Sequence, residues 1–198
     1  MDKLKIIVLV AKSSAGKDNI LNKVVELNPK VKTIVSYTSR PIRQGEIDGI
    51  TYHYISNEKV NNMLANQEFI ENRIYNTVNG KWVYGVGKSS FDLYSKNTYI
   101  VILDLQGLKQ LENYLNENNK LDCLISIYIK ASGQTRLLRS LQREGQLSDN
   151  QCKEICRRFI SDEEDMEYAE GYCNITLVNE VEDDLNKCIE YVYHLTIN

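Results

Sequence analysis

The sequence predicts an α/β protein in which a parallel five-stranded sheet lies between two layers of helices. Apolar, β-branched runs recur at residues 6–10, 34–37, 99–103, 124–129 and 175–178. Runs of this kind are typical of strands that are buried on both faces. Segments with helical periodicity separate them, at 17–27, 106–118, 134–143, 150–168 and 182–195. We therefore expect a three-layer α/β sandwich.

The first apolar run leads directly into a small-residue loop that ends in a lysine. Residues 11–18, Ala-Lys-Ser-Ser-Ala-Gly-Lys-Asp, approximate the phosphate-binding pattern G-x-x-x-x-G-K-[ST]. In the intact pattern, loop amides and a helix N-terminus bind phosphate oxygens, the lysine reaches the terminal phosphates and the hydroxyl binds Mg²⁺. A plain strand-to-helix turn with a surface lysine is the alternative. The residues expected to hold phosphates are Ser13, Ser14, Ala15, Gly16, Lys17 and Asp18.

Two segments depart from the alternation of strands and helices. Between residues 36 and 87, short antiparallel strands are predicted at 52–55, 69–75 and 82–84, a hairpin turn at Asn79-Gly80 and a short helix at 57–66. Residues 132–165 are dense in arginine. The chain has two prolines and no linker-like stretch, so we expect excursions from one domain rather than separate domains. The arginines are Arg136, Arg139, Arg143, Arg157 and Arg158.

Composition limits the classes of partner. The formal net charge of −3 gives no broad attraction to nucleic acid or to an anionic membrane, so a small anionic ligand is expected. The five cysteines lack paired spacing and are interpreted as reduced thiols rather than disulfides or metal ligands. No signal peptide or membrane-length apolar run is recognisable. We expect a cytoplasmic monomer or homodimer that binds small molecules.

An ordered series of motifs resembles the guanylate kinase family along nearly the whole chain. Residues 36–56, from Ser36-Tyr-Thr-Ser-Arg40-Pro41 to Tyr52-His-Tyr-Ile-Ser56, resemble its nucleotide-monophosphate-binding segment. The resemblance implies a P-loop NTPase fold in a single domain of residues 1–198. It divides the chain into a core (1–35, 88–131 and 166–198), a monophosphate-binding subdomain (36–87) and a helical lid (132–165). Further matches are Glu68-Phe69-Ile70-Glu71, Tyr84-Gly85, Asp104-Leu-Gln106-Gly107, Arg139 with Arg143, Arg158 with Asp165, and Val178-Asn179.

Four residues of the subdomain are candidates for binding an acceptor phosphate. Arg40 and Arg43 lie three residues apart on a loop stiffened by Pro41, and they can offer forked guanidinium contacts to a phosphate dianion. Tyr52 and Tyr84 can add hydroxyl donors, as the resemblance also implies. Solvent-exposed residues at the rim are the alternative for each.

The resemblance also implies which residues contact the base. Guanine presents N1–H and N2–H₂ as a donor edge that one carboxylate can accept, and the resemblance gives this role to Glu71. Ser36 and Asp104 are implied as further base-side contacts. Val86 stands where the family has serine or threonine, and its side chain cannot form a hydrogen bond. The sequence therefore leaves the identity of the preferred base undecided. An ordinary surface glutamate is the alternative for Glu71.

The arginine-rich segment and the last strand supply the remaining candidates. Guanidinium groups stabilise the charge that spreads over a transferring phosphoryl group. Arg139, Arg143 and Arg158 match the family's lid and catalytic arginines, and a spacing of four places Arg139 and Arg143 on one helix face. A solvated helix face is the alternative. Asn179 matches a position used near the donor adenine, and it is equally a candidate N-cap for the last helix.

Asp18 changes the expected metal site. The family has Ser or Thr at this position, and its D-x-D motif reads Ile102-Leu-Asp104 here. Like charges ~4 Å apart at an effective dielectric constant of ~20 repel by ~4 kcal/mol, so a carboxylate beside phosphates needs a nearby cation. We expect Asp18 to support Mg²⁺, directly or through water. A degraded metal site is the alternative.

These features together predict ATP-dependent transfer of a phosphoryl group to a nucleoside monophosphate. GMP or dGMP, giving GDP or dGDP, is the first expectation, with Mg²⁺ accompanying ATP. Lys17, Arg139, Arg143 and Arg158 are the expected catalytic residues. A kinase of another nucleoside or deoxynucleoside monophosphate is one alternative, and a non-catalytic guanylate-kinase-like binding module is the other.

Overall fold

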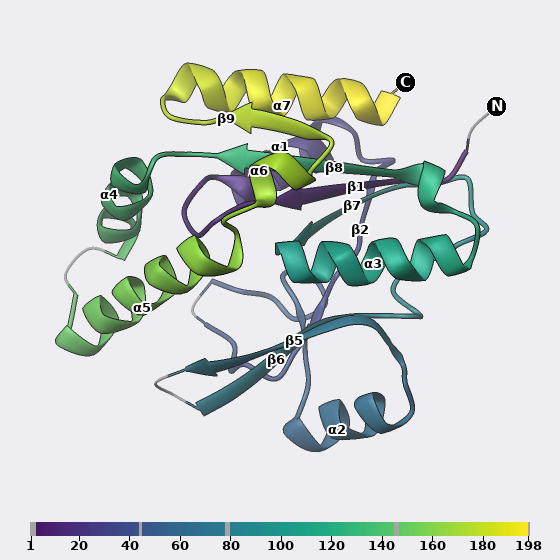
Figure 1. The fold of residues 1–198 in the computed structure, drawn as a ribbon, viewed down its shortest axis with the longest axis horizontal. Coiled ribbons are helices and arrows are strands. Elements are labelled where there is room, and N and C mark those ends of the chain that lie inside the picture. Colours follow the sequence, from purple (N-terminus) through teal and green to yellow (C-terminus); the bar gives the residue numbers. More distant parts are fainter. Residues whose placement is uncertain (1–2, 44, 78–79, 145–146, 198) are drawn as a thin grey trace.

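The computed structural model describes residues 3–43, 45–77, 80–144 and 147–197, and it is built around a parallel five-stranded sheet (Figure 1). The strands lie in the order β2-β7-β1-β8-β9. Strand β1 pairs with β7 along its full length, from Lys5 opposite Thr98 to Val10 opposite Leu103. The predicted parallel sheet is confirmed. Its strands are β1 (Lys5–Val10), β2 (Lys32–Thr33), β7 (Thr98–Leu103), β8 (Leu124–Lys130) and β9 (Ile175–Val178).

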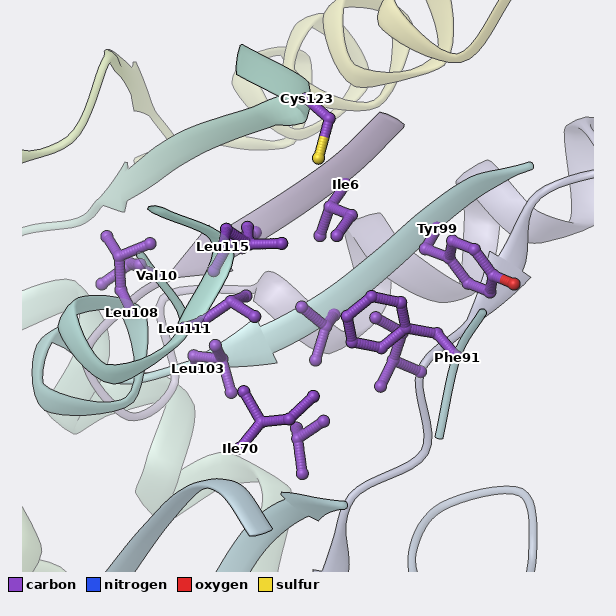
Figure 2. Close-up of a cluster of buried hydrophobic side chains, with 14 of the residues drawn as sticks. Ile6, Val10, Ile70, Phe91, Tyr99, Leu103, Leu108, Leu111, Leu115 and Cys123 are labelled. Carbon is purple, nitrogen blue, oxygen red and sulfur yellow. The ribbon is translucent and has the colours of Figure 1, made fainter. Parts of the chain in front are cut away.

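Helices cover both faces of this sheet, as a sandwich of three layers requires. Helices α1 (Lys17–Leu27) and α7 (Glu182–Ile197) contact each other on one face, and α3 (Leu105–Glu117) packs on the other. Strand β1 shows the division, because Ile7 and Leu9 join the cluster with α1 and α7, whereas Ile6, Val8 and Val10 join the cluster with α3. Figure 2 shows the α3 side, where leucines of that helix lie among side chains of β1 and β7.

A smaller four-stranded sheet, ordered β4-β3-β6-β5, holds much of residues 36–87. The long strands β5 (Phe69–Thr77) and β6 (Gly80–Gly87) are antiparallel, as predicted. The prediction for β4 (His53–Tyr54) is wrong, because it pairs parallel to β3 (Tyr37–Thr38). A long connection rather than a tight turn separates β3 from β4, so the chain returns in the same direction. Helix α2 (Asn57–Ala65) precedes β5. The predicted Asn79-Gly80 turn lies partly outside the described residues.

The strand predicted at 34–37 is wrong as a single element. The Ile34 amide still donates to the Ile100 carbonyl of the core sheet at 2.9 Å, but the Ser36 carbonyl already accepts from His53 at 2.9 Å. The chain therefore crosses from the core sheet to the smaller sheet within this apolar run. Periodicity cannot distinguish one strand from two short strands in different sheets.

Helices α4 (Gly133–Glu144) and α5 (Asp149–Asp165) lie together beyond the end of β8 (Figure 1). Ser148 and Gln151 form the expected capping box of α5. The helix predicted over 150–168 is wrong at its C-terminal end, because α5 stops at Asp165 and the short α6 (Ala169–Tyr172) follows. The turn between them lets Met166 and Ala169 join the α3-side cluster.

A 3-10 helix, η1 (Leu121–Cys123), precedes β8. No described helix is long and apolar enough to span a bilayer.

Candidate functional site

One cavity of about 1350 Å³ brings together nearly all of the residues expected at the site. It opens beyond the carboxyl ends of β1, β7 and β9, the edge at which open α/β sheets bind ligands. Ala15 and Glu71 are the two expected residues that do not line it. Those that do are Ser13, Ser14, Gly16, Lys17, Asp18, Ser36, Arg40, Arg43, Tyr52, Tyr84, Asp104, Arg139, Arg143, Arg158 and Asn179.

The phosphate loop between β1 and α1 is braced by Asn179, which directly follows β9. Gly16 has a φ of +99°, and a Cβ atom there would lie 2.3 Å from Nδ2 of Asn179. That Nδ2 donates to the Ala15 carbonyl at 2.7 Å. Asn179 is buried, and α7 begins only at Glu182, so the N-cap interpretation of Asn179 is wrong. The residue supports the loop that the sequence predicts to bind phosphates.

Helix α5 places two carboxylates against the phosphate loop, and the sequence did not indicate this contact. Asp162 accepts a hydrogen bond from the Ser13 amide. Glu163 pairs with Lys12 and with the buried guanidinium of Arg136. Although burial opposes ionisation, these two cations hold the pKa of Glu163 below its ordinary value. A carboxylate of α5 thus accepts a hydrogen bond from an amide that the sequence predicts to bind phosphate.

Arg40 is held in place at the acceptor end by Glu46. Its Nη2 lies 2.7 Å from Glu46 Oε1, its Nη1 donates to Oε2 at 3.0 Å, and its Nε donates to the Tyr84 hydroxyl at 3.1 Å. The Tyr54 hydroxyl donates to Glu46 at 2.7 Å. Burial would raise the pKa of Glu46, but the hydrogen bonds from Arg40 and Tyr54 outweigh it and lower that pKa to about 2. Glu46 belongs to the matched segment, yet only the structure gives it this orienting role.

Tyr52 lies against Arg40 and Tyr84 in the wall of the cavity. Its ring lies below the Arg40 guanidinium, with 5.5 Å between the guanidinium carbon and the ring centroid, and 5.6 Å from the ring of Tyr84. Burial raises the pKa of Tyr52 to about 12, and the negative charge of Asp18 adds to the shift. Asp18 belongs to the first turn of α1, and it lines the same cavity as Tyr52.

At the base end, an arginine that the sequence analysis passed over lies against the two expected carboxylates. Nε of Arg73 is 3.0 Å from Glu71 Oε2, and Nη1 is 3.1 Å from Asp104 Oδ2. Asp104 is also the N-cap of α3, accepting from the Gly107 amide at 2.8 Å, and it accepts from the Tyr75 hydroxyl. Burial raises the pKa of Glu71 even though the charge of Arg73 opposes the shift. Val86 belongs to the α3-side hydrophobic cluster.

The lid arginines approach the cavity in different ways. Arg139 donates from Nη1 to the Asn179 carbonyl at 3.0 Å and from Nη2 to the Glu180 carbonyl at 3.2 Å. Arg143 and Arg158 line the cavity together with Arg157. Arg157 makes two hydrogen bonds to Glu154, of 2.9 and 2.8 Å. These contacts place a cluster of guanidinium groups at the lid side of the cavity.

The donor set around Asp18 fits a magnesium ion bound together with phosphates. Asp18 Oδ2 lies 3.4 Å from Lys17 Nζ, and the Asp18 side chain is 69% exposed. Within the described part of the chain, no three His, Cys, Asp or Glu residues gather as a metal cluster. Mg²⁺ is commonly held by one or two carboxylates, substrate phosphates and water, so one exposed carboxylate beside a phosphate loop is sufficient.

Comparisons with known proteins all find similarity to guanylate kinases. The family model described as guanylate kinase matches residues 3–195. A guanylate kinase of Buchnera aphidicola subsp. Baizongia pistaciae is 31% identical over 167 residues, which cover 82% of this chain and 75% of the relative. One from Caldanaerobacter subterraneus subsp. tengcongensis is 27% identical over 195 residues, covering 97% and 86%. The crystal structure of guanylate kinase from Anaplasma phagocytophilum has the same fold, with a TM-score of 0.68 at 21% identity, covering 100% of this chain and 89% of that chain.

Proposed function

This chain belongs to the guanylate kinase family, and on that premise we propose that it transfers the γ-phosphoryl group of ATP to GMP, giving GDP and ADP. The observation that carries the proposal is the single cavity lined by the phosphate loop, by the acceptor arginines and by the lid arginines. Phosphoryl transfer needs little covalent chemistry from a protein, but it needs donor and acceptor phosphates held in line among positive charges.

On the donor side, we assign the triphosphate to the loop residues 13–17. Lys17 would stay in contact with the phosphoryl group while that group moves from ATP to GMP. The partly exposed side chain of Lys17 lines the cavity. The Ser13 amide would exchange the Asp162 carboxylate for a phosphate oxygen. Mg²⁺ bound with ATP would neutralise phosphate charge, and Asp18 is the residue that would hold it, directly or through water.

On the acceptor side, we assign the phosphate of GMP to Arg40, Arg43, Tyr52 and Tyr84. Glu46 restricts the Arg40 guanidinium to one orientation, so little side-chain entropy remains to be lost on binding. Ser36 and Asp104 line the base end, and Glu71 lies behind Arg73. This acceptor subdomain corresponds to residues 36–87, and the core to 1–35, 88–131 and 166–198.

The lid, residues 132–165, would complete the site by bringing Arg139, Arg143 and Arg158 against the transferring group. Guanidinium groups placed there stabilise charge that develops in the transition state. Closure also excludes water, which would otherwise compete with GMP for the phosphoryl group. The contact between Asp162 and the loop supports this assignment, because it already brings α5 against the donor end.

A coupled assay of ADP release over a panel of monophosphates tests the proposal. With ATP and Mg²⁺, GMP and dGMP should give the highest kcat/KM, ahead of AMP, CMP and UMP. Lys17→Met should lose at least 100-fold in kcat, because transition-state charge stabilisation by one such group is worth ~2.7–4 kcal/mol. Its thermal unfolding midpoint should stay unchanged, which separates lost chemistry from lost folding. Equal activity with all five monophosphates would contradict guanine selectivity, and ATP binding without turnover would favour a binding module.

We also propose that the enzyme works in the cytoplasm with small-molecule nucleotides as its partners. All five cysteines are free thiols, and Cys123 and Cys188 are buried. Reduced thiols in this number suit a compartment that keeps them reduced. The formal net charge of −3 also gives no broad attraction to nucleic acid.

A further inference from the structure

The base end of the cavity presents an arginine where a carboxylate was expected. Glu71 is fully buried, with 0% of its surface exposed, and it does not line the cavity. Arg73 and Asp104 do line it, and the Arg73 side chain keeps 10% of its surface exposed. A base that enters this cavity therefore meets the guanidinium of Arg73 before it can reach Glu71.

The contacts of Arg73 fix its position without using all of its hydrogen atoms. Nε and Nη2 lie 3.0 and 3.4 Å from the two oxygens of Glu71, and Nη1 lies 3.1 Å from Asp104. A guanidinium carries five N–H groups. Nη2 donates to Glu71 Oε1 and Nη1 faces Asp104, whereas Nε has no aligned hydrogen-bond acceptor among the described residues. Nη1 and Nη2 carry two N–H groups each, so each keeps an N–H beyond these contacts. Nη1 and Nη2 are the two nitrogens at the end of the guanidinium fork.

The pair formed by Arg73 and Glu71 is enclosed by helix α3, which opposes its rearrangement. A Cβ atom added to Gly107, in the first turn of α3, would lie 2.9 Å from Glu71 Oε2 and 3.4 Å from Arg73 Nε. The helix thus approaches the pair as closely as a glycine allows. Uncovering Glu71 would require separating a buried ion pair, which is strongly unfavourable when one partner is left uncompensated.

We propose that Arg73 is the specificity-determining residue for the base, and that the enzyme accepts 6-oxopurine monophosphates, GMP and IMP alike. A guanidinium fork pairs with O6 and N7 of a 6-oxopurine, whereas adenine directs a 6-amino donor at the same fork. Asp104, which lines the cavity beside Arg73, would accept N1–H, which guanine and hypoxanthine share. Glu71 is a positioning residue that acts through Arg73, so the 2-amino group of guanine is not read by it. This inference rests on the proposed kinase function.

The first test compares kcat/KM for GMP, IMP and AMP on the unmodified full chain with ATP and Mg²⁺. If Arg73 recognises the base, kcat/KM for GMP and for IMP should agree within about threefold. The value for AMP should be roughly 100-fold lower, which is the discrimination that one bidentate pair gives against a wrong base. Direct reading of the 2-amino group by Glu71 would instead separate GMP from IMP by about 10- to 100-fold, the value of a hydrogen bond to a charged group. That separation would overturn the inference. Failure of the kinase function itself looks different, because no monophosphate would then be phosphorylated.

Two variants test the roles of the pair separately. Glu71→Gln keeps the shape of the side chain, and it should lower kcat/KM for GMP and IMP by the same factor, since both depend on Arg73. Arg73→Lys keeps the positive charge but loses the fork. It should lower kcat/KM for GMP and for IMP at least tenfold, and it should leave kcat/KM for AMP unchanged. A Glu71→Gln variant that loses activity with GMP but not with IMP would contradict the inference.

Lys109 supplies a matched control for charge. It lines a neighbouring pocket that also contains Arg73 and Asp104, and its ammonium lies 4.9 Å from the centroid of the Tyr172 ring. Lys109→Met removes a cation from this region without removing a proposed base contact, so the ratios among GMP, IMP and AMP should not change. If Arg73→Lys fails to fold, the GMP-to-IMP ratios of the unmodified chain and of Glu71→Gln still decide the question.

Discussion

Replacing Gly16 with alanine tests the brace between the phosphate loop and Asn179. The backbone of Gly16 is left-handed, at φ +99°, and a non-glycine residue there costs ~1–2 kcal/mol. The new methyl group would also lie 2.3 Å from Asn179 Nδ2, which donates to the Ala15 carbonyl at 2.7 Å. Displacing that buried amide forfeits a hydrogen bond and leaves polar atoms unsatisfied, for a further ~1–3 kcal/mol. The free energy of unfolding should therefore fall by about 2–5 kcal/mol.

Gly80→Ala is the matched control. Gly80 has a φ of +108°, and an added Cβ would meet nothing within 4 Å, so only the ~1–2 kcal/mol of backbone strain applies. Urea unfolding with linear extrapolation measures both variants without nucleotide. Calorimetric titration should then show at least a tenfold loss of ATP affinity for Gly16→Ala alone. Equal losses of stability in the two variants, with ATP affinity retained in both, would refute the reasoning.

Three further predictions concern charged groups around the cavity. Asp162→Asn should lower KM for ATP by up to about tenfold, since ~1.4 kcal/mol of competition for the Ser13 amide is removed; an unchanged or raised KM in steady-state kinetics would argue against competition. The depressed pKa of Glu46, about 2 against 4.5, means that its stabilisation is complete above pH 4.5 and is lost as the pH falls toward 2. In urea titrations the stability gap between the unmodified chain and Glu46→Gln should thus narrow from pH 6 to pH 3, and a constant gap would exclude the linkage. Asp18→Ser should shift the Mg²⁺ concentration that gives half-maximal activity, whereas an identical Mg²⁺ titration would remove Asp18 from the metal site.

The elements that sequence patterns predicted well are those whose signal is local. Strands β1, β7 and β8 are short, largely buried apolar runs, β9 is a partly buried apolar run at the sheet edge, and α3 and α7 have regular apolar periodicity. The run at 34–37 misled because Ile34 and Tyr37 satisfy the same apolar pattern in two different sheets. The direction of β4 depends on how the chain returns after β3, which periodicity does not encode.

The site residues that the sequence missed are joined by contacts between distant segments. Ser13 and Asp162 are 149 positions apart, and no local pattern brings α5 to the phosphate loop. Arg73 offered a weak signal, because residues two apart on a strand share a face, and that face already held Glu71. Its partner Asp104 becomes visible only when β5 packs beside α3. Motif matching found the groups expected to touch phosphates, but it did not find the residues that orient them.

One measurement tests most directly whether the two phosphate sites face each other. A bisubstrate ligand, in which adenosine and guanosine are joined through five phosphates, can span donor and acceptor sites only if these open into the same cavity. Calorimetric titration should give one ligand per chain, an affinity at least 100-fold above that of ATP or GMP alone, and displacement by both nucleotides, as expected for linked binding groups. Binding no tighter than ATP, displaced by ATP but not by GMP, would contradict the proposed arrangement.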